Sequence, residues 1–135
     1  MKKLRMFLTV VGVLSIVACG QETLNERHKE YLSNKGWEIK ESNEIETYTL
    51  DIPDEMLRNY EASEITFLSE HLGETVTQYS YELKEKDIEG ERLKAVILEV
   101  DGEIIGGHGV LPSWDPGLFN LDEKELLINE QMIKQ

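Results

Sequence analysis

The dipeptide Asp101-Gly102 constrains the fold of this chain more than any other short feature of its sequence. A tight type I′ hairpin turn requires positive φ angles at both central positions, and aspartate followed by glycine satisfies this requirement. Residues 92–100 and 103–110 on either side are rich in aliphatic and β-branched side chains, so we expect two antiparallel strands there. Apolar side chains on both faces of residues 92–100 predict a central strand, covered on both faces or covered on one and partly exposed on the other.

Two further strands and a helical region are expected before this hairpin. Residues 37–50 and 75–83 contain the β-favouring alternation of a partly buried strand. Pro53, followed by two acidic residues, is typical of a helix start, and Gly73 is a natural end. The apolar stripe between them fits one helix with a bend near Ala62, or two short helices.

The two ends of the expected domain carry similar capping signals. Thr23 and Glu26 have the spacing of a capping box, which predicts a helix over residues 24–33 that ends near Asn34 or Gly36.

Asp122 and Glu125 repeat this spacing, and Leu121 with Leu126 matches a hydrophobic staple. We therefore expect a last helix over residues 123–134, docked on the sheet or loosely attached. Together these elements predict an α+β domain with two layers, in which helices pack on one face of an antiparallel sheet of about four strands. Residues 23–121 form the globular part and residues 122–135 the C-terminal helix.

The N-terminal residues have the pattern of an export signal. Lys2, Lys3 and Arg5 precede an apolar run over residues 6–18. A helix over that run reaches about 20 Å, which is short of the roughly 30 Å hydrocarbon core of a bilayer. The run ends at the single cysteine of the chain, Cys19.

Residues 16–19, Ile-Val-Ala-Cys, resemble the bacterial lipobox. This resemblance implies that residues 1–18 are a lipoprotein signal peptide and that Cys19 is lipidated and becomes the first mature residue. Residues 19–22 would then be a short tether that holds the domain at the membrane through its acyl chains. The alternative is an ordinary cleaved signal in which the cysteine is incidental.

The composition limits the classes of partner. With 27 acidic and 14 basic residues, the chain has a formal charge of −13, and the expected signal peptide contains no acidic residue to remove. Such a surface repels nucleic acid and favours cations, basic polypeptides or simple solubility. With one cysteine, no disulfide within the chain is available to stabilise the fold.

The most suggestive cluster for binding is the run Gly106-Gly107-His108-Gly109. Glycines can bring backbone amides close to a phosphate or carboxylate, but the phosphate loops that use them lead into a helix. Here the run leads to Leu111-Pro112, and glycines inside a strand more often mark a bulge or the close approach of another element. We favour the structural interpretation and keep Gly106, Gly107 and His108 as speculative binding residues.

The sequence offers little support for metal binding or catalysis. His28, His71 and His108 lack the spacing of a metal site, so no metal or other cofactor is expected. The chain contains no Gly-x-Ser-x-Gly elbow, and its thiol is assigned to lipid, so we expect a protein that is not an enzyme. Trp114, between Pro112 and Pro116, is either an exposed recognition anchor or a lid over one end of the core.

Several short segments resemble a family of small lipoproteins from Bacillus-type bacteria that is known only as a domain of unknown function. They are Gly36-Trp37-Glu38-Ile39, Ile52-Pro53, Tyr79-Ser80-Tyr81 and residues 102–107, within a region from Tyr31 to Leu121. The family usually has a longer segment where this chain has Leu72-Gly73-Glu74. The resemblance implies an α+β domain on the outer face of a Gram-positive-type cell membrane, and it supplies no activity or functional residue.

Three classes of function fit these observations. The first is a non-enzymatic envelope lipoprotein that binds a protein or a small ligand. The second is a regulator or inhibitor of a neighbouring membrane protein, which the short tether over residues 19–22 would favour. The third, an envelope enzyme, has the least support.

Overall fold

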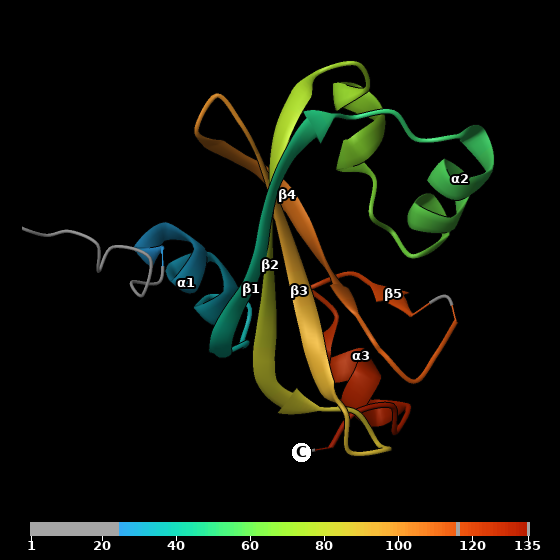
Figure 1. The fold of residues 1–135 in the computed structure, drawn as a ribbon. Coiled ribbons are helices and arrows are strands. Elements are labelled where there is room, and N and C mark those ends of the chain that lie inside the picture. Colours follow the sequence, from blue (N-terminus) through green and yellow to red (C-terminus); the bar gives the residue numbers. More distant parts are fainter. Residues whose placement is uncertain (1–24, 116, 135) are drawn as a thin grey trace, which may run out of the picture.

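The computed structural model describes residues 25–115 and 117–134, and it contains a five-stranded antiparallel sheet with helices, an α+β fold (Figure 1). The strands follow one another across the sheet in the order β1-β2-β3-β4-β5. Their bounds are β1 Ile39–Thr49, β2 Thr75–Lys86, β3 Arg92–Val100, β4 Glu103–Val110 and β5 Leu118–Phe119. The helical elements are α1 Glu26–Ser33, α2 Asp54–Ala62, the 3₁₀ helix η2 Phe67–His71 and α3 Lys124–Asn129.

The predicted hairpin between β3 and β4 is confirmed. Asp101 and Gly102 have φ angles of 52° and 80°, and the strands on either side pair antiparallel. The register between these strands shifts between Leu98 and Glu99, where they oppose Gly106 and Ile104. The glycine-rich strand therefore contains the bulge that the sequence favoured.

The core lies on both faces of the sheet, in two clusters. Ile97 and Leu98 are adjacent in β3, so their side chains point to opposite faces. Ile97 belongs to the first core cluster, with Leu32 of α1 and Leu127 of α3. Leu98 belongs to the second core cluster, against which Leu57 and Tyr60 of α2 pack.

The helices consequently flank both faces of the sheet, where the sequence predicted one face (Figure 1). The sheet also has five strands where about four were expected. The additional strand β5 is only two residues long and pairs with Gly109 and Val110, so its pattern is too short to stand out in the sequence.

Helix α1 begins two residues later than predicted. The side chain of Asn25 caps it by accepting hydrogen bonds from the backbone amides of Arg27 and His28. Thr23, the predicted cap, lies outside the described residues. The helical region after Pro53 is divided into α2 and η2 by a turn at which Glu64 has a φ angle of 62°.

The C-terminal region differs from the single long helix that was predicted. Helix α3 covers only Lys124–Asn129, and no side chain caps its first residue. Asp122 instead forms an ion pair with Lys35, with 2.6 Å between its Oδ1 atom and Nζ. The following residues turn back, and the backbone amide of Lys134 donates to the carbonyl of Lys86 at the end of β2. With Leu127 and Ile133 buried, this segment docks on the first core cluster.

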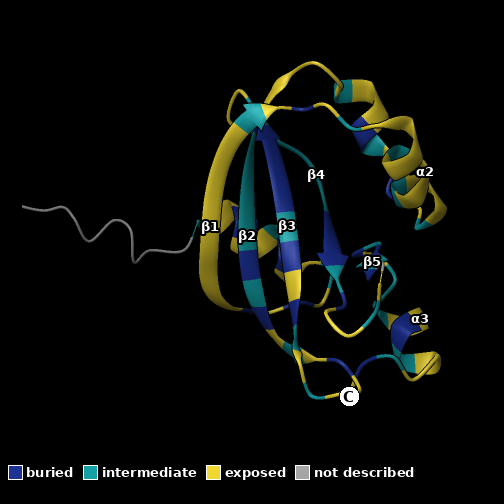
Figure 2. Cartoon of the chain, turned by 45° about the vertical axis from the view of Figure 1, so that its right-hand side comes forward, coloured by how far each residue is buried: buried dark blue, intermediate teal, exposed yellow. Residues whose placement is uncertain are grey.

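Exposure varies strongly between elements (Figure 2). Strand β1 forms one edge of the sheet and is exposed along most of its length, and α2 contains no fully buried residue. No helix in residues 25–115 and 117–134 is both long and apolar enough to cross a membrane. The predicted signal peptide, residues 1–18, and the predicted tether, residues 19–22 with Cys19, lie outside the described part of the chain.

Candidate functional site: a cavity beneath helix α2

The four speculative binding residues do not form one site. His108 is buried in β4 and faces Tyr60 of α2, next to the second core cluster. Trp114 is half-buried and packs against the first core cluster, as a lid over the core would. Gly106 and Gly107 line a separate cleft at the open edge of β4.

The glycines of β4 are explained by packing. A Cβ atom added to Gly106 would lie 2.6 Å from the ring of Phe67, and one added to Gly107 would lie 2.6 Å from the carbonyl oxygen of Val96. At Gly109 the ring of Phe119 occupies the space of a side chain. Aromatic rings from two segments can lie against β4 only because these positions carry no side chain.

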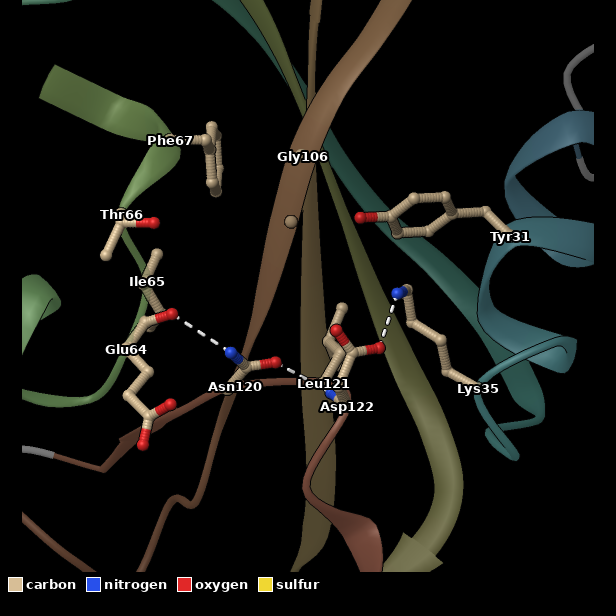
Figure 3. Close-up of a pocket in the computed structure, with 11 residues that line it drawn as sticks. Tyr31, Lys35, Glu64, Ile65, Thr66, Phe67, Gly106, Asn120, Leu121 and Asp122 are labelled. Atoms are coloured by element: carbon tan, nitrogen blue, oxygen red, sulfur yellow. Dashed lines mark hydrogen bonds and ion pairs between the residues drawn. The ribbon is translucent and has the colours of Figure 1, made fainter. Parts of the chain in front are cut away.

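The cleft at the edge of β4 is a polar depression of about 150 Å³ between α1 and the segment before η2 (Figure 3). Its polar groups largely satisfy one another. Lys35 is paired with Asp122, and the side-chain amide of Asn120 donates to the carbonyl of Glu64 over 2.9 Å. The hydroxyl of Tyr31 points toward Gly106 (Figure 3). Because most of these donors and acceptors are occupied, this cleft offers a ligand little polar recognition.

A second cavity, which we call the α2 cavity, lies between α2 and the sheet and has a volume of about 190 Å³. Its lining combines apolar side chains with polar ones in similar measure, and ligand sites commonly place a few polar groups among apolar walls. The residues that line it are Tyr48, Thr49, Leu50, Asp51, Ile52, Met56, Tyr60, Leu68, Gln78, Leu98 and His108.

His108 is the most buried polar residue of this cavity, with 6% of its surface exposed. The ring of Tyr60 meets its imidazole edge-on, with 5.3 Å between the ring centroids. Burial lowers the pKa of His108, and the nearby carbonyl of Gly109 opposes this only partly, so the imidazole is neutral near pH 7. Its Nδ1 atom lies 3.4 Å from that carbonyl oxygen.

A carbonyl oxygen accepts hydrogen bonds and does not donate them, so the proton of the neutral imidazole belongs on Nδ1. The Nε2 atom of His108 is then an acceptor, and no described residue donates to it.

Two tyrosines and a glutamine add polar groups to the same cavity. The hydroxyl of Tyr48 donates to Oε1 of Gln78 over 2.5 Å, which leaves the amide nitrogen of Gln78 free of any described acceptor. The hydroxyl of Tyr60 has no hydrogen-bond partner among the described residues. Burial raises the pKa of both tyrosines, so both hydroxyls remain protonated at neutral pH.

Helix α2 covers this cavity loosely. Leu57 and Tyr60 are only half-buried, and Met56, which lines the cavity, is 49% exposed. Helix α1, by comparison, contributes the fully buried His28 and Leu32. A helix with so little buried surface is held weakly, because burial of apolar surface provides most of the stability of a short helix.

A buried polar network lies on the other face of the sheet. His28 of α1 is fully buried between Tyr81 of β2 and Glu99 of β3, and hydrogen-bonds to both. Arg27 adds an ion pair to Glu99, with 3.1 Å between Nη2 and Oε2. Tyr79 packs its ring against His28 at 4.4 Å. Because His28, Tyr81 and Glu99 are buried and His28 bonds to both of the others, the network joins α1 to the sheet.

The third histidine, His71, lies at the end of η2 and pairs with Glu74 over 3.0 Å. The three histidines are thus in separate surroundings. In the described part of the chain, no group of three or more His, Cys, Asp and Glu side chains is arranged to hold a metal ion.

Sequence reasoning selected His108 but missed the other polar residues of its cavity, Tyr48, Gln78 and Tyr60. Tyr60 belongs to the apolar stripe that predicts the helical region between Pro53 and Gly73, and this pattern assigns it no binding role. Its position above His108 depends on how α2 lies over the sheet, and no local pattern encodes that.

Comparison with known proteins yields no match to the chain: no family model fits it, and no curated protein or solved structure is significantly similar to it. The proposed function therefore rests on the geometry of the site and on the sequence, and the resemblance to small Bacillus-type lipoproteins stays a prediction.

Proposed function

We propose that this protein is a lipid-anchored, non-enzymatic binding module on the outer face of a Gram-positive-type cell membrane, and that the α2 cavity is its ligand site. The export pattern of residues 1–18 and the position of Cys19 support the location. Two acyl chains on that cysteine would give a lasting anchor, whereas one alone binds a membrane only marginally.

The observation that carries the binding role is the environment of His108. A neutral imidazole that is almost fully buried has an acceptor nitrogen without a described donor, and it lines a cavity of about 190 Å³. Among the described residues, the buried side-chain atom without a hydrogen-bond partner is Oδ2 of Asp87, so the Nε2 atom of His108 is accessible from the cavity, where a ligand could donate a hydrogen bond to it. The lining contains one aliphatic hydroxyl, that of Thr49, which is exposed and has no hydrogen bond to His108, and this favours binding over catalysis.

A cavity-filling substitution tests this role. The full chain, incubated with a small-molecule extract of the envelope, should carry a bound compound in native mass spectrometry. Met56→Trp should abolish that adduct, because the larger side chain would occupy the cavity from the α2 side.

Leu126→Trp is the matched control, since Leu126 is also a large exposed apolar residue, at 45%, and lies in α3 outside the cavity lining. An adduct that survives Met56→Trp, or that is lost equally in both variants, would contradict the proposed site.

The proposed lipid anchor and membrane location have a separate test. Cells that express the full chain should incorporate labelled palmitate into it, and the protein should fractionate with membranes. Cys19→Ser should lose the label and release the domain. A wild-type protein with a free thiol at Cys19 would overturn the proposed anchor.

Regulation of a neighbouring membrane protein is a second candidate, favoured by the closeness of α1 to the proposed anchor. Helix α1 begins at Glu26, so the segment after Cys19 spans at most about 25 Å when fully extended. Such a reach would restrict contacts to partners near the membrane. An insertion of about ten residues after Cys19 should then weaken the phenotype, and an unchanged phenotype would count against this candidate.

A further inference from the structure

We propose that the α2 cavity takes a small uncharged molecule with an apolar body and one hydroxyl or N–H group, and that the Nε2 atom of His108 accepts a hydrogen bond from that group. This inference rests on the proposed binding function, because it names the ligand chemistry of the same site. Its test is chosen so that a wrong ligand class and a wrong site give different results.

The size of the cavity sets the size of the ligand. An apolar cavity of about 150 Å³ in another protein holds a benzene molecule. The α2 cavity, at about 190 Å³, therefore has room for a six-membered ring with one or two further non-hydrogen atoms. Phenol and benzyl alcohol are of this size.

The walls of the cavity favour an apolar body. Leu50, Leu68 and Leu98 are buried and belong to the second core cluster, so they form a fixed aliphatic surface. Ile52 and Met56 complete the apolar lining. Because the three leucines are already almost fully buried, the apolar surface that a ligand can remove from water lies mainly on Ile52 and Met56, and its removal is worth about 25 cal/mol per Å².

The hydrogen-bonding group of the ligand follows from the surroundings of His108. Its Nδ1 atom faces the carbonyl oxygen of Gly109 and carries the proton, which leaves Nε2 as an acceptor. A ligand with a hydroxyl or N–H group can donate to Nε2, whereas a ligand with only acceptors cannot. The hydroxyl of Tyr60 and the amide nitrogen of Gln78 are further donors, from which the oxygen of a ligand hydroxyl could accept a hydrogen bond.

The charges around the cavity exclude ionised ligands. Its lining contains no lysine or arginine, and Asp51 is its only carboxylate. An anion would meet no cationic partner there and would be repelled by Asp51. A cation would lose its hydration against aliphatic walls, while Asp51, which is exposed to water, would compensate only weakly. An uncharged ligand avoids both costs.

The loose packing of α2 allows such a ligand to enter and predicts a second effect of binding. Tyr60 of α2 contacts His108, and Met56 of α2 lines the same cavity. A ligand between α2 and the sheet would bury more of both side chains. Binding should therefore slow the exchange of the α2 backbone amides with solvent.

The test is a titration of the full chain, followed by NMR of its leucine methyl groups and histidine nitrogens. The probes are phenol, toluene and benzoate, which share a ring and differ in their polar group. Phenol should shift the methyl signals of Leu68 and Leu98 with a dissociation constant on the order of 1 mM. Toluene should bind about threefold to tenfold more weakly, because it lacks the donor for His108. Benzoate should leave these signals unchanged.

The preference for phenol should disappear in His108→Phe, which removes the acceptor and keeps an aromatic ring. Phenol should then bind no better than toluene, and toluene should bind as it does to the wild type. His71→Phe is the matched control, because His71 lies outside the cavity, and it should keep the full preference. If His108→Phe does not fold, the wild-type protein still gives an answer, since phenol should shift the Nε2 signal of His108 and toluene should not.

Each outcome is decisive. Equal binding of phenol and toluene at Leu68 and Leu98 would overturn the role of His108 and leave the cavity as an apolar binding site. Benzoate that binds as tightly as phenol would overturn the uncharged class. If none of the probes shifts the cavity methyl groups, the α2 cavity is not a ligand site, and the proposed function fails together with this inference.

Discussion

The Nδ1 atom of His28 in α1 lies 2.5 Å from the hydroxyl oxygen of Tyr81 in β2, and this contact joins the first helix to the centre of the sheet. The other imidazole nitrogen, Nε2, hydrogen-bonds to the carboxylate of Glu99 in β3. A neutral imidazole satisfies both neighbours when Nε2 donates its proton to Glu99 and Nδ1 accepts from Tyr81. Protonation of His28 would place a second proton between Nδ1 and Tyr81 and remove that acceptor.

We expect the protein to lose stability as the pH falls below about 6.5. Burial lowers the pKa of His28, although the hydrogen bond and charge of Glu99 oppose this, and burial also lowers the pKa of His108. In this range the unfolded chain binds more protons than the folded one, which favours unfolding by up to about 1.4 kcal/mol per pH unit for each histidine. Urea unfolding at pH 7.5 and pH 5.5 measures the difference.

His28→Gln should reduce this pH dependence as well as the stability itself. His71→Gln is the control, because His71 is partly exposed and paired only with Glu74. A pH dependence that is the same in His28→Gln and in the wild type would show that His28 does not titrate on unfolding.

Tyr81→Phe should destabilise the protein by about 1–3 kcal/mol. The substitution keeps the ring in the core but leaves the buried Nδ1 atom of His28 without its hydroxyl partner. Tyr31→Phe is a matched control, since the Tyr31 hydroxyl has no hydrogen-bond partner among the described residues, and it should change the free energy of unfolding by less than about 0.5 kcal/mol. Equal effects in chemical denaturation would argue against the network around His28.

Gly109→Ala should be among the most destabilising single substitutions in the sheet. The added methyl group would occupy the space that the ring of Phe119 fills, and such overpacking typically costs about 1–3 kcal/mol or more. Thermal unfolding of the single and double variants checks this. Phe119→Leu combined with Gly109→Ala should lose less stability than the sum of the two single losses, and strict additivity would mean that the two residues are not in contact.

The amides of α2 should exchange with solvent faster than those of α1. None of the α2 residues is fully buried, whereas α1 is held by the fully buried His28 and Leu32. Opening of α2 alone therefore exposes little apolar surface and costs little free energy. Hydrogen exchange followed by mass spectrometry measures both helices in one experiment, and equal protection would contradict a loosely held α2.

The sequence predicted the elements whose signals are local. The turn at Asp101-Gly102 and the strands on either side are encoded by residues that are neighbours in the chain, and the structure has them as expected. The same holds for the helix that begins after Pro53 and for the interpretation of Gly106 as part of a bulge.

The predictions that were wrong concern elements that depend on contacts between distant segments of the chain. The capping pattern of Asp122 and Glu125 predicted a helix start, but Asp122 pairs with Lys35 of the loop after α1, and this competing contact leaves α3 without a side-chain cap. Strand β5 forms only because Leu118 and Phe119 lie beside the end of β4.

The candidate site shows the same limit. His108 was identifiable as an unusual residue among glycines, but its cavity is formed by residues from β1, the loop after β1, α2, η2, β2, β3 and β4. Neither the depth of that cavity nor the pairing of Tyr48 with Gln78 has a counterpart in the local sequence pattern.

The packing of α1 and α2 against opposite faces of the sheet separates the start of the described chain from the candidate site. The chain enters the domain through α1, on the face of the first core cluster, whereas the α2 cavity lies on the other face. In the proposed lipid-anchored protein, a ligand could therefore occupy the cavity while five strands stand between it and the helix that follows the anchor segment.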